Sequence, residues 1–254
     1  MNDYVWDWEV VRRYSPAFRN GTIVTLLLTV IIIVVGTLLG TVLGVLQAST
    51  RPALKPIRWL VTAYVELLRG LPVLVFLIWL HYVAPQSSAW LYNAIAAIHD
   101  LLRPHIGKLG NAIMNGISSR AFATAALALS LNLSAFVADI VRSGVTSVPR
   151  PLVDAAKSLG MGSWLRLRRV ILPETFRASL PALVAMYITM FKFTTLAAFI
   201  GCSELLNTVF TAGNSSYRYL ELYTMLAAVY LVVLLPSTWC ARRLENTRWF
   251  RRSL

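Results

Sequence analysis

The chain has 254 residues, of which 57% are hydrophobic and only 14% are charged, and this composition excludes an ordinary soluble globular domain. The net charge of +13 at pH 7 does not indicate nucleic-acid binding, because the basic residues lie in loops between apolar runs. An integral membrane protein is the expected class.

The N-terminal residues 1–20 do not read as a cleaved signal peptide. They contain Asp, Glu, Trp and Arg residues and lack the required order of a basic, an apolar and a small-residue region. We therefore expect the first span to act as its own insertion signal. The two cysteines, Cys202 and Cys240, lie at or near apolar segments and indicate neither a disulfide framework nor a metal site.

Five apolar runs are long enough to cross a membrane, which takes about 20 residues for about 30 Å of hydrocarbon. The expected spans are residues 22–48, 57–82, 121–140, 177–201 and 219–240. In the first span, Gly36, Gly40 and Gly44 recur at four-residue spacing. Such a stripe permits close helix packing, and a stripe that faces lipid fits the pattern equally well.

The second span contains a polar interruption between Glu66 and Pro72. Glu66 and Arg69 are costly in an apolar helix unless they face protein or water. Gly70 and Pro72 predict a break in the helix at this point. A purely structural kink, with Arg69 extended to the membrane surface, is the alternative interpretation.

Residues 84–119 form a long connection between the second and third spans. Within it, residues 89–102 are amphipathic, with Trp90, Ile95 and Ile98 among the apolar residues of one side. We expect this piece to rest on the outer membrane surface. It is too short and too polar to be a sixth span.

Residues 149–173 form a polar segment between the third and fourth spans. Pro149 and Pro151 stop the preceding helix and start a short new one, with Asp154 near its N-terminus. Four of its residues share one face, and two of them are small enough for close approach by a partner: Leu152, Ala155, Ala156 and Leu159.

The same polar segment has clear end signals. Gly160 and Gly162 break the short helix. Ser163 is then expected to cap a second turn or two of helix, which Pro173 ends.

The fourth span carries a cation near its middle, Lys192, at a depth where insertion costs about 2.5–3.5 kcal/mol. Lys192 therefore needs a partner, either Glu66 or Glu204 or the carboxylate of a transported molecule. If the partner is the carboxylate of a transported molecule, Arg69 and the Thr194 and Thr195 hydroxyls are further suitable donors to it. The alternative is an internal ion pair that fixes the register of the helices.

Residues 149–173 resemble the EAA loop of the inner-membrane subunits of ATP-binding-cassette importers. The counterparts of the family's Glu-Ala-Ala, Gly and Leu-Pro are Asp154-Ala155-Ala156, Gly160 and Leu172-Pro173, preceded by Ile171, with Asp in place of Glu. Residues 68–73, 138–144, 191–196 and 204–205 are similar to stretches of the permeases for polar amino acids. Two departures are the extra Ser143 and Phe193, which replaces an aspartate and argues against a basic amino acid as substrate.

The resemblance covers about residues 20–243 and implies an all-α integral membrane protein with the type I ABC importer transmembrane fold. About five transmembrane helices are implied, with the N-terminus outside and the C-terminus inside. The implied parts are an external segment 1–20, a transmembrane domain 21–243 with coupling loop 149–173 and external insertion 84–119, and a basic cytoplasmic tail 244–254. Loop charge agrees, because this orientation puts fifteen Lys and Arg residues inside and seven outside.

In function, the resemblance implies a permease subunit for polar amino acids in a bacterial cytoplasmic (inner) membrane. The implied partners are two ABC ATPase subunits, a second permease chain, identical or paralogous, and an external solute-binding protein. The resemblance implies that one set of residues couples the chain to the ATPase: Asp154, Ala155, Ala156, Leu159, Gly160, Leu172 and Pro173. A second set consists of candidates for the substrate pathway: Glu66, Arg69, Pro72, Lys192, Thr194, Thr195 and Glu204.

The sequence contains no G-x-x-x-x-G-K-[ST] motif, so ATP and Mg²⁺ are expected on partner subunits and no cofactor on this chain. His81, His99 and His105 lack metal-ligand spacing, and no catalytic residues are expected. An ion-coupled secondary transporter that acts without an ATPase is the alternative function, although no inverted repeat is evident. A membrane anchor that only recruits a soluble complex is a third.

Overall fold

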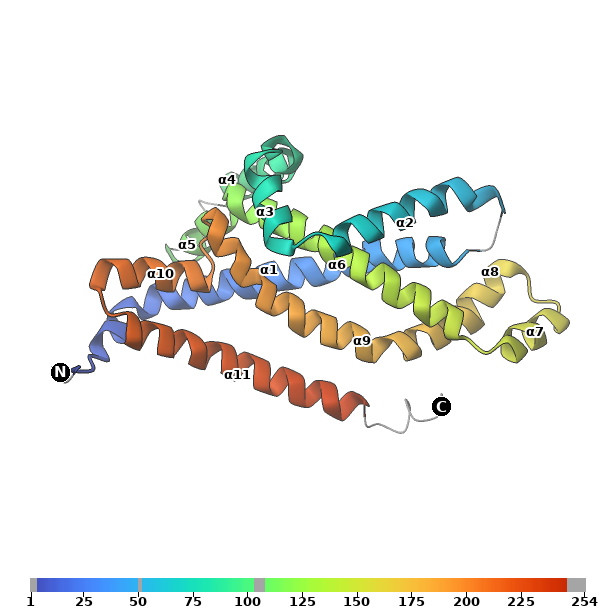
Figure 1. Cartoon of the computed structure of the whole chain (residues 1–254). Helices are drawn as coiled ribbons and strands as arrows, with labels where there is room; N and C mark the ends of the chain where they lie inside the picture. The colour runs from blue at the N-terminus through green and yellow to red at the C-terminus, as the bar shows by residue number, and fades with distance from the viewer. Residues whose placement is uncertain (1–3, 50–51, 103–107, 246–254) are drawn as a thin grey trace. The chain divides into compact units, whose positions relative to one another are not determined.

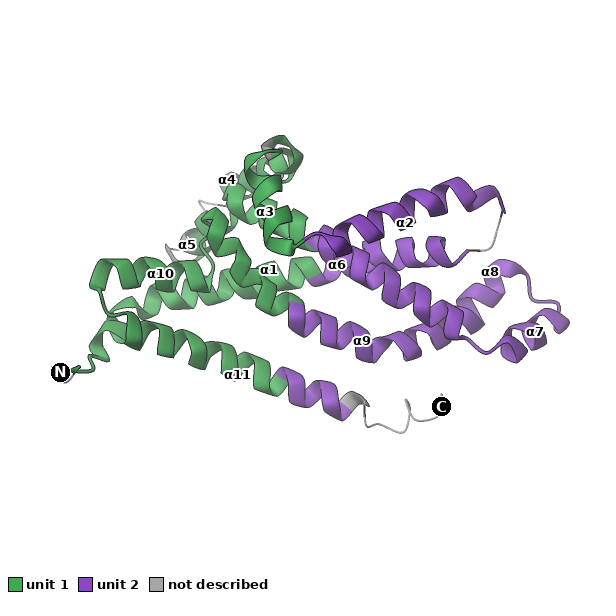
Figure 2. Ribbon diagram, in the orientation of Figure 1, with its two compact units in different colours: residues 1–32, 72–129, 190–236 green, residues 33–71, 130–189, 237–254 purple. Residues whose placement is uncertain are grey.

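The computed structural model describes residues 4–49, 52–102 and 108–245, and within these ranges the regular structure is helical. The chain divides into two units, each assembled from three stretches of sequence (Figure 2). Unit 1 consists of residues 1–32, 72–129 and 190–236, and unit 2 of residues 33–71, 130–189 and 237–254.

Figure 1 shows the helices in chain order. The α-helices are α1 (Glu9–Ala48), α2 (Lys55–Gly70), α3 (Val73–Tyr82), α4 (Ala89–Leu102), α5 (Lys108–Ile117), α6 (Arg120–Ser147), α7 (Arg150–Ser158), α8 (Ser163–Arg166), α9 (Leu172–Phe193), α10 (Leu205–Ser216) and α11 (Tyr219–Glu245). Short 3₁₀ segments lie at Pro52–Leu54, Pro85–Ser88 and Thr194–Ile200, and a π-helical turn lies at Leu167–Ile171.

Four helical runs are long and apolar enough to cross a membrane: Glu9–Ala48, Arg120–Ser147, Ser163–Ile200 and Tyr219–Arg243. The pair α2 and α3 makes a fifth if it counts as one broken span, so the predicted number of about five is confirmed. The spans differ in how much of their surface the chain itself covers. In the most apolar window of α6, 83% of the residues are buried, against 17% in α11. Helix α11 therefore leaves most of its apolar surface to lipid or to another chain.

Helix α1 begins at Glu9 and not near residue 22, where the apolar run starts. In unit 1 its first turns bury Val10 and Phe18 against Val209 of α10 and Leu222 of α11. Only one side of these turns is apolar, and polar residues separate Val10 from Phe18 in the sequence. The stretch therefore does not read as part of an apolar span.

The segment before α1 is anchored to the start of α11. The fully buried Glu221 carboxylate accepts a hydrogen bond from the Tyr4 hydroxyl at 2.5 Å and another from the Asp7 backbone N–H at 2.9 Å. Arg218 completes the cluster, because its guanidinium lies 3.7 Å from Glu221 and donates to the Val5 carbonyl at 2.9 Å. The buried carboxylate is thus paired and hydrogen-bonded, as a buried charge requires.

In unit 2 the glycine stripe of α1 faces protein. A Cβ atom on Gly40 would lie 2.6 Å from the Ser134 carbonyl oxygen, and one on Gly44 would lie 2.6 Å from the Ala138 carbonyl oxygen. Both carbonyls belong to α6, so the small residues allow the backbones of the two helices to approach closely. Of the two alternatives for this stripe, the structure supports helix packing.

The predicted break in the second span is confirmed, since α2 ends at Gly70 and α3 begins at Val73. Pro72 has no N–H, so it cannot donate to the Leu68 carbonyl four residues earlier. In unit 2 the Asn132 side chain of α6 donates to that carbonyl at 3.1 Å. An amide inside an apolar span thus satisfies the backbone group that the proline leaves free.

The connection 84–119 contains two helices. Helix α4 has the bounds expected for the amphipathic piece, whereas α5 had not been predicted. In unit 1 the buried Ser88 hydroxyl lies 2.9 Å from the Thr124 hydroxyl of α6. Trp90, Ile98 and Leu101 of α4 are exposed. Contact of this apolar surface with the outer membrane surface stays a prediction.

Candidate functional site

Helix α7 carries the residues that resemble a coupling loop, and it lies in unit 2. Pro149 is its N-cap residue and Pro151 lies in its first turn, as expected. Asp154 falls in the second turn and not near the N-terminus as expected, because the helix begins at Arg150. Asp154 therefore does not cap the helix. Its carboxylate accepts a hydrogen bond from Lys157 at 2.8 Å, and this contact lowers the pKa of Asp154.

The four residues predicted to share one face of α7 differ in their exposure. Ala156 is 4% exposed and packs into the protein. Leu152, Ala155 and Leu159 are exposed, and Leu159 is the most open of them at 77%. An exposed alanine between two exposed leucines forms a short apolar face with room for a closely packed partner.

Gly160 ends α7 through its backbone conformation. Its φ of +73° lies in the left-handed region, which glycine adopts without a steric penalty. The Gly160 N–H donates to the Lys157 carbonyl at 2.9 Å, and the Met161 N–H donates to the Ala156 carbonyl at 3.1 Å. These bonds satisfy carbonyl groups at the helix end and fix the direction in which the chain leaves it.

The second half of the polar segment differs from the prediction. Gly162, not Ser163, is the N-cap residue of α8, and no side chain caps this helix. Pro173 does not end a helix, because it is the second residue of α9. A π-helical turn at Leu167–Ile171 precedes it. The wider turn accommodates the missing N–H of the proline, so that helix continues from Ser163 into the fourth span.

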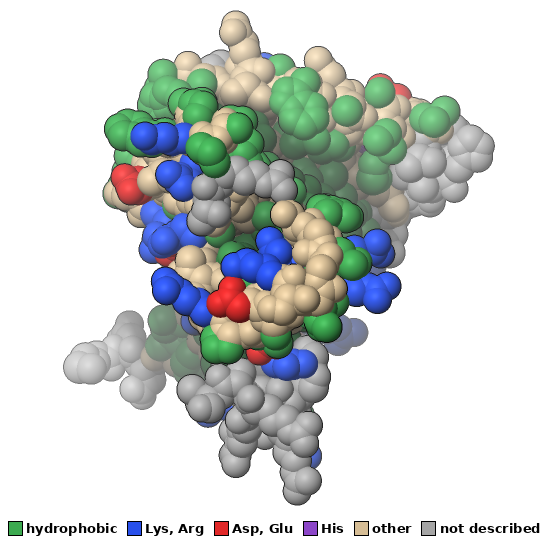
Figure 3. Space-filling view, turned by 90° about the vertical axis from the view of Figure 1, so that its right-hand side faces the viewer, with side chains coloured by type: hydrophobic (Ala, Val, Ile, Leu, Met, Phe, Trp, Pro, Cys, Tyr) green, Lys and Arg blue, Asp and Glu red, His purple; other side chains and the backbone are tan. Residues whose placement is uncertain are grey.

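A strongly basic surface surrounds α7 and α8. Figure 3 shows Lys and Arg side chains gathered at the end of unit 2 that carries these helices, with few acidic groups among them. The exposed basic residues on these helices and on the adjoining π-helical turn are Arg150, Lys157, Arg168 and Arg169. Ser163 and Trp164 of α8 also line a pocket of about 420 Å³ with Leu46 of α1 and Val145 of α6.

In unit 2 the polar break of the second span forms an ion-pair network. The Arg69 guanidinium lies 2.8 Å from the Asp139 carboxylate of α6 and also stacks over the Phe136 ring at 5.5 Å. Asp139 also binds Arg142 at 2.8 Å. Glu66, three residues before Arg69, is exposed. The sequence had not identified Asp139 as the partner of Arg69, although it lies in one of the stretches that carried the resemblance.

In unit 1 the end of α9 carries Lys192, which is exposed. The Thr194 hydroxyl donates to the Phe191 carbonyl and the Thr195 hydroxyl donates to the Lys192 carbonyl, each at 2.7 Å. Both hydroxyl protons are thus used within the helix, and the oxygen lone pairs remain as acceptors. Pro72, another candidate for the pathway, is the N-cap residue of α3.

Glu204 is fully buried in unit 1, where it caps α10. Its carboxylate accepts hydrogen bonds from the backbone N–H groups of Leu206 at 2.9 Å and Asn207 at 2.8 Å. Thr25 of α1 lies 3.4 Å from the same carboxylate and accepts from the Leu205 N–H at 3.0 Å. Lys192, for which Glu204 was one suggested partner, does not appear among these contacts.

Burial raises the pKa of Glu204 from 4.5 to about 7. The folded protein therefore keeps this proton up to about pH 7, whereas the unfolded chain releases it near pH 4.5. Folding stability should fall as pH rises between these values, by on the order of 3 kcal/mol. We expect the melting temperature of the purified complex to decrease from about pH 5 to about pH 8, and Glu204→Gln to flatten this dependence.

The exposed Glu9 provides a matched control on the same unit. Glu9→Gln should keep the pH dependence of the unchanged protein, because it also replaces a carboxylate by an amide but leaves the contacts of Glu204 intact. Equal pH dependence in Glu204→Gln and the unchanged protein would contradict the assignment of the proton to Glu204.

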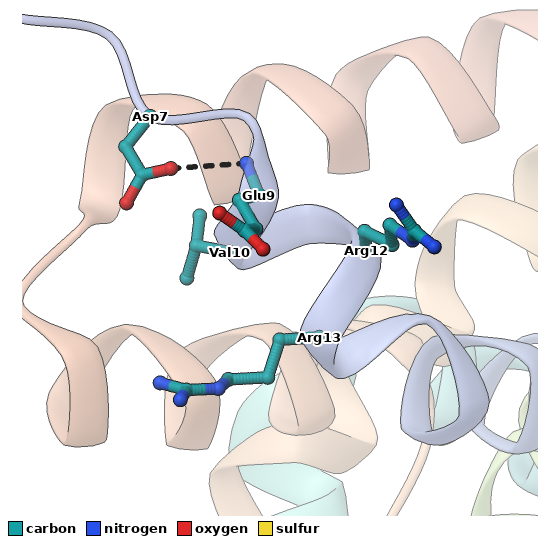
Figure 4. Close-up of a pocket in the computed structure, with 5 residues that line it drawn as sticks. All are labelled: Asp7, Glu9, Val10, Arg12 and Arg13. Atoms are coloured by element: carbon teal, nitrogen blue, oxygen red, sulfur yellow. Dashed lines mark hydrogen bonds between the residues drawn. The ribbon is translucent and has the colours of Figure 1, made fainter.

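A further pocket, of about 580 Å³, lies at the start of α1 in unit 1 and contains none of the predicted site residues. Figure 4 shows Asp7, Glu9, Arg12 and Arg13 around it, with the two arginines pointing in different directions. The Asp7 carboxylate accepts a hydrogen bond from the Glu9 N–H at 3.0 Å. Among the described residues, no group of three or more His, Cys, Asp or Glu side chains could hold a metal ion.

The described residues contain four helical runs that are long and apolar enough to cross a membrane, or five with the broken pair α2 and α3, and the short helix α7 lies between two of them in the chain. These are features of a membrane-embedded protein with a polar loop between two spans. Residues 36–248 match the family of binding-protein-dependent transport system inner membrane components. The chain belongs to this family.

Individual relatives are similar over most of their length. The chain is 29% identical over 235 residues to the glutamate/aspartate import permease protein GltK of Escherichia coli O6:H1, which covers 92% of this chain and 95% of GltK. It is 30% identical over 187 residues to PatM of Vibrio harveyi, a probable amino-acid ABC transporter permease protein, covering 72% of this chain and 73% of PatM.

A solved structure supports the fold. A chain in the crystal structure of an amino acid ABC transporter with histidines matches with a TM-score of 0.73 and 30% identity, over 96% of this chain and 99% of that one. The predicted type I ABC importer transmembrane fold and the resemblance to amino acid permeases are thereby confirmed.

Proposed function

We propose that the chain is the permease subunit of an ATP-driven importer of polar amino acids in the bacterial cytoplasmic membrane. The observation that carries this proposal is the match, over most of the chain, to permeases named for amino acid transport, GltK and PatM. The exposed apolar face of α7 supports it further, because a subunit without a nucleotide-binding loop needs a contact through which ATP hydrolysis acts on it.

In the proposed mechanism α7 docks in a groove of the ATPase through Leu152, Ala155 and Leu159. The buried Ala156 holds α7 to the rest of unit 2, so movement of the ATPase carries the chain with it. Helical structure continues from Ser163 to Phe193 through the π-helical turn. A push on α7 is therefore transmitted along the fourth span as a rigid-body movement, which opens the passage alternately to the two sides of the membrane.

The orientation follows from the same proposal. The coupling loop 149–173 and the basic tail 244–254 face the cytoplasm, and the segment 1–20 and the insertion 84–119 face outward. ATP and Mg²⁺ bind to the ATPase subunits. A second permease chain completes the passage, and an external solute-binding protein delivers the amino acid.

We also propose that the polar residues of the two broken or irregular helical regions line the substrate passage. These are Glu66, Arg69 and Pro72 at the break of the second span and Lys192 and Thr195 at the end of the fourth. The buried Thr194 and Glu204 act behind them, by holding the backbone at the end of α9 and the start of α10. Ionisable side chains in membrane-crossing helices are costly, and they persist where they face a passage or pair with each other. Arg69 forms an ion pair with Asp139, so Asp139 positions the guanidinium group that Arg69 presents to the passage.

A cross-linking experiment tests the coupling contact. In a Cys240→Ser background, with Cys202 buried, Ala155→Cys should cross-link to the co-purified ATPase in intact cells. Ala156→Cys is the matched control, because this neighbouring side chain is buried and should give no cross-link. Cross-links from Ala155→Cys that reach only lipid or the permease itself would refute the coupling contact. Absence of ATP-dependent amino acid uptake by the reconstituted complex would refute the function.

A further inference from the structure

Helix α2 has a polar face that runs along the helix. Its polar residues recur at spacings of three and four, which places them on one side: Lys55, Arg58, Thr62, Glu66 and Arg69. A separate face is buried in the protein at Val61, Val65 and Leu68. Trp59, Leu60 and Leu67 are exposed apolar residues of α2. A membrane helix with a polar face of this kind borders water or protein at that face.

This polar face opens into a pocket of about 410 Å³ within unit 2. The pocket is lined from three helices, by Gln47 of α1, by Arg58, Thr62 and Glu66 of α2, and by Asp139 and Arg142 of α6. A second pocket of about 410 Å³ extends it along α2 and shares Arg58, Thr62 and Glu66. We call the two together the α2 groove.

The charges in the α2 groove are only partly compensated by the chain itself. Asp139 is engaged by Arg69 and Arg142, each at 2.8 Å. Arg58 donates to the Ser49 carbonyl at 3.1 Å. Within the described ranges neither Arg58 nor Glu66 takes part in an ion pair. The guanidinium groups of Arg58, Arg142 and Arg69, which also lines the pocket, face the carboxylates of Glu66 and Asp139. The groove therefore carries one net positive charge.

Two polar atoms of the lining residues are buried without a hydrogen-bond partner in the described part of the chain, namely Gln47 Oε1 and Arg142 Nε. Buried polar atoms of this kind normally bind something, because leaving them unpaired costs free energy. One is an acceptor and the other a donor, so together they suit a ligand that carries both kinds of group.

We propose that the α2 groove binds the transported amino acid in the half of the passage next to the coupling loop. The α-carboxylate binds to Arg58 and Arg142, and the α-ammonium group binds to Glu66. This inference rests on the proposed function, and it adds a site and a substrate class. The net positive charge of the groove repels amino acids with a cationic side chain, so the groove binds acidic and neutral amino acids.

The electrostatic part of the proposal is tested by a cysteine in the groove, Thr62→Cys, placed in the Cys240→Ser background of the full detergent-purified complex. Its reaction rates with an anionic and a cationic methanethiosulfonate reagent are compared, relative to the same ratio for a free thiol. The groove should favour the anionic reagent by about fivefold. Arg142→Gln should bring this preference close to that of the free thiol. Ala63→Cys, in the second pocket, is a second reporter in case Thr62→Cys does not fold.

The binding part is tested by protection of the same cysteine. An excess of L-glutamate or L-glutamine should slow the labelling of Thr62→Cys at least about threefold, and L-arginine should not. Leu60→Cys, an exposed residue of the apolar face, is the matched control, and no amino acid should change its labelling.

Three results would overturn the proposal. The first is labelling of Thr62→Cys that no amino acid slows, although the reconstituted complex takes up amino acids. The second is equal protection by L-arginine and L-glutamate, and the third is a preference for the cationic reagent. Failure of the proposed function is a different result, because it is absence of uptake in the reconstituted complex, whereas the labelling does not depend on ATP.

Discussion

Gly160→Val should uncouple ATP hydrolysis from amino acid uptake, whereas Gly162→Val should leave them coupled. Gly160 has a φ of +73°, and a β-branched residue in that region costs about 1–3 kcal/mol. Nothing lies within 4 Å of a Cβ atom added at Gly160, so the expected effect comes from the backbone and not from a clash. The hydrogen bonds that end α7 should be lost, and α7 should no longer point into the ATPase in a fixed direction.

Strain of this size shifts a conformational equilibrium by about fivefold to 150-fold. We therefore expect uptake by the reconstituted complex to fall at least about fivefold while ATP continues to be hydrolysed. The measurement is the number of ATP molecules hydrolysed per amino acid transported. Gly160→Asn should have a milder effect than Gly160→Ala, and Gly160→Val the strongest, because asparagine tolerates the left-handed region best.

Gly162 is the matched control, because a Cβ atom there also meets open space. Its φ of −58° and ψ of 157° are accessible to any residue, so Gly162→Val changes bulk at the same loop without backbone strain. Similar uncoupling in both variants would show that bulk in the loop matters and the conformation of Gly160 does not. Normal coupling in Gly160→Val would contradict the role of α7 as a rigid connection.

The helices that the sequence predicted well are those whose signals are local. Helix α4 has the predicted bounds because an amphipathic pattern runs through it without interruption. The break between α2 and α3 falls at Gly70 and Pro72 because proline and glycine act on their own backbone. Gly160 ends α7 for the same reason.

The differences arise where a contact with another helix decides the local structure. The first turns of α1 are too polar to read as part of a span, and packing against α10 and α11 keeps them helical. Pro173 signals a helix end, yet the π-helical turn before it lets the helix continue. Local propensity does not reveal such compensation.

For the candidate site, the sequence identified ionisable residues in spans but not how they pair. The sequence places Glu66 three residues before Arg69 on the same helix. In the structure the partner of Arg69 is Asp139 of α6, 70 residues later in the chain. Glu204 had been considered as a partner of Lys192, and it caps α10 instead. Pairing across helices depends on register, which a single sequence does not specify.

Gly40→Leu should strongly destabilise unit 2. A Cβ atom on Gly40 would lie 2.6 Å from both the Ser134 carbonyl oxygen and the Val137 Cβ atom, and both neighbours are on the buried helix α6. A backbone carbonyl cannot rotate away as a flexible side chain can, so α1 and α6 must move apart. We expect a loss of about 3 kcal/mol or more, at the upper end of overpacking effects. The melting temperature and monodisperse yield of the purified complex measure it.

Two further variants, Gly40→Ala and Val42→Leu, show whether the loss of stability comes from the close contact of α1 with α6 or from any added volume on α1. Gly40→Ala already adds the clashing Cβ atom, so it should lower the melting temperature, by less than Gly40→Leu. Val42 is exposed on the same helix, and Val42→Leu should leave the melting temperature unchanged although it also adds volume. If all three variants melted like the unchanged protein, α1 and α6 could not be packed backbone to backbone. The positions of Asp139 and Arg142, one to two turns further along α6, would then lose their structural support, and with them the charge arrangement of the α2 groove.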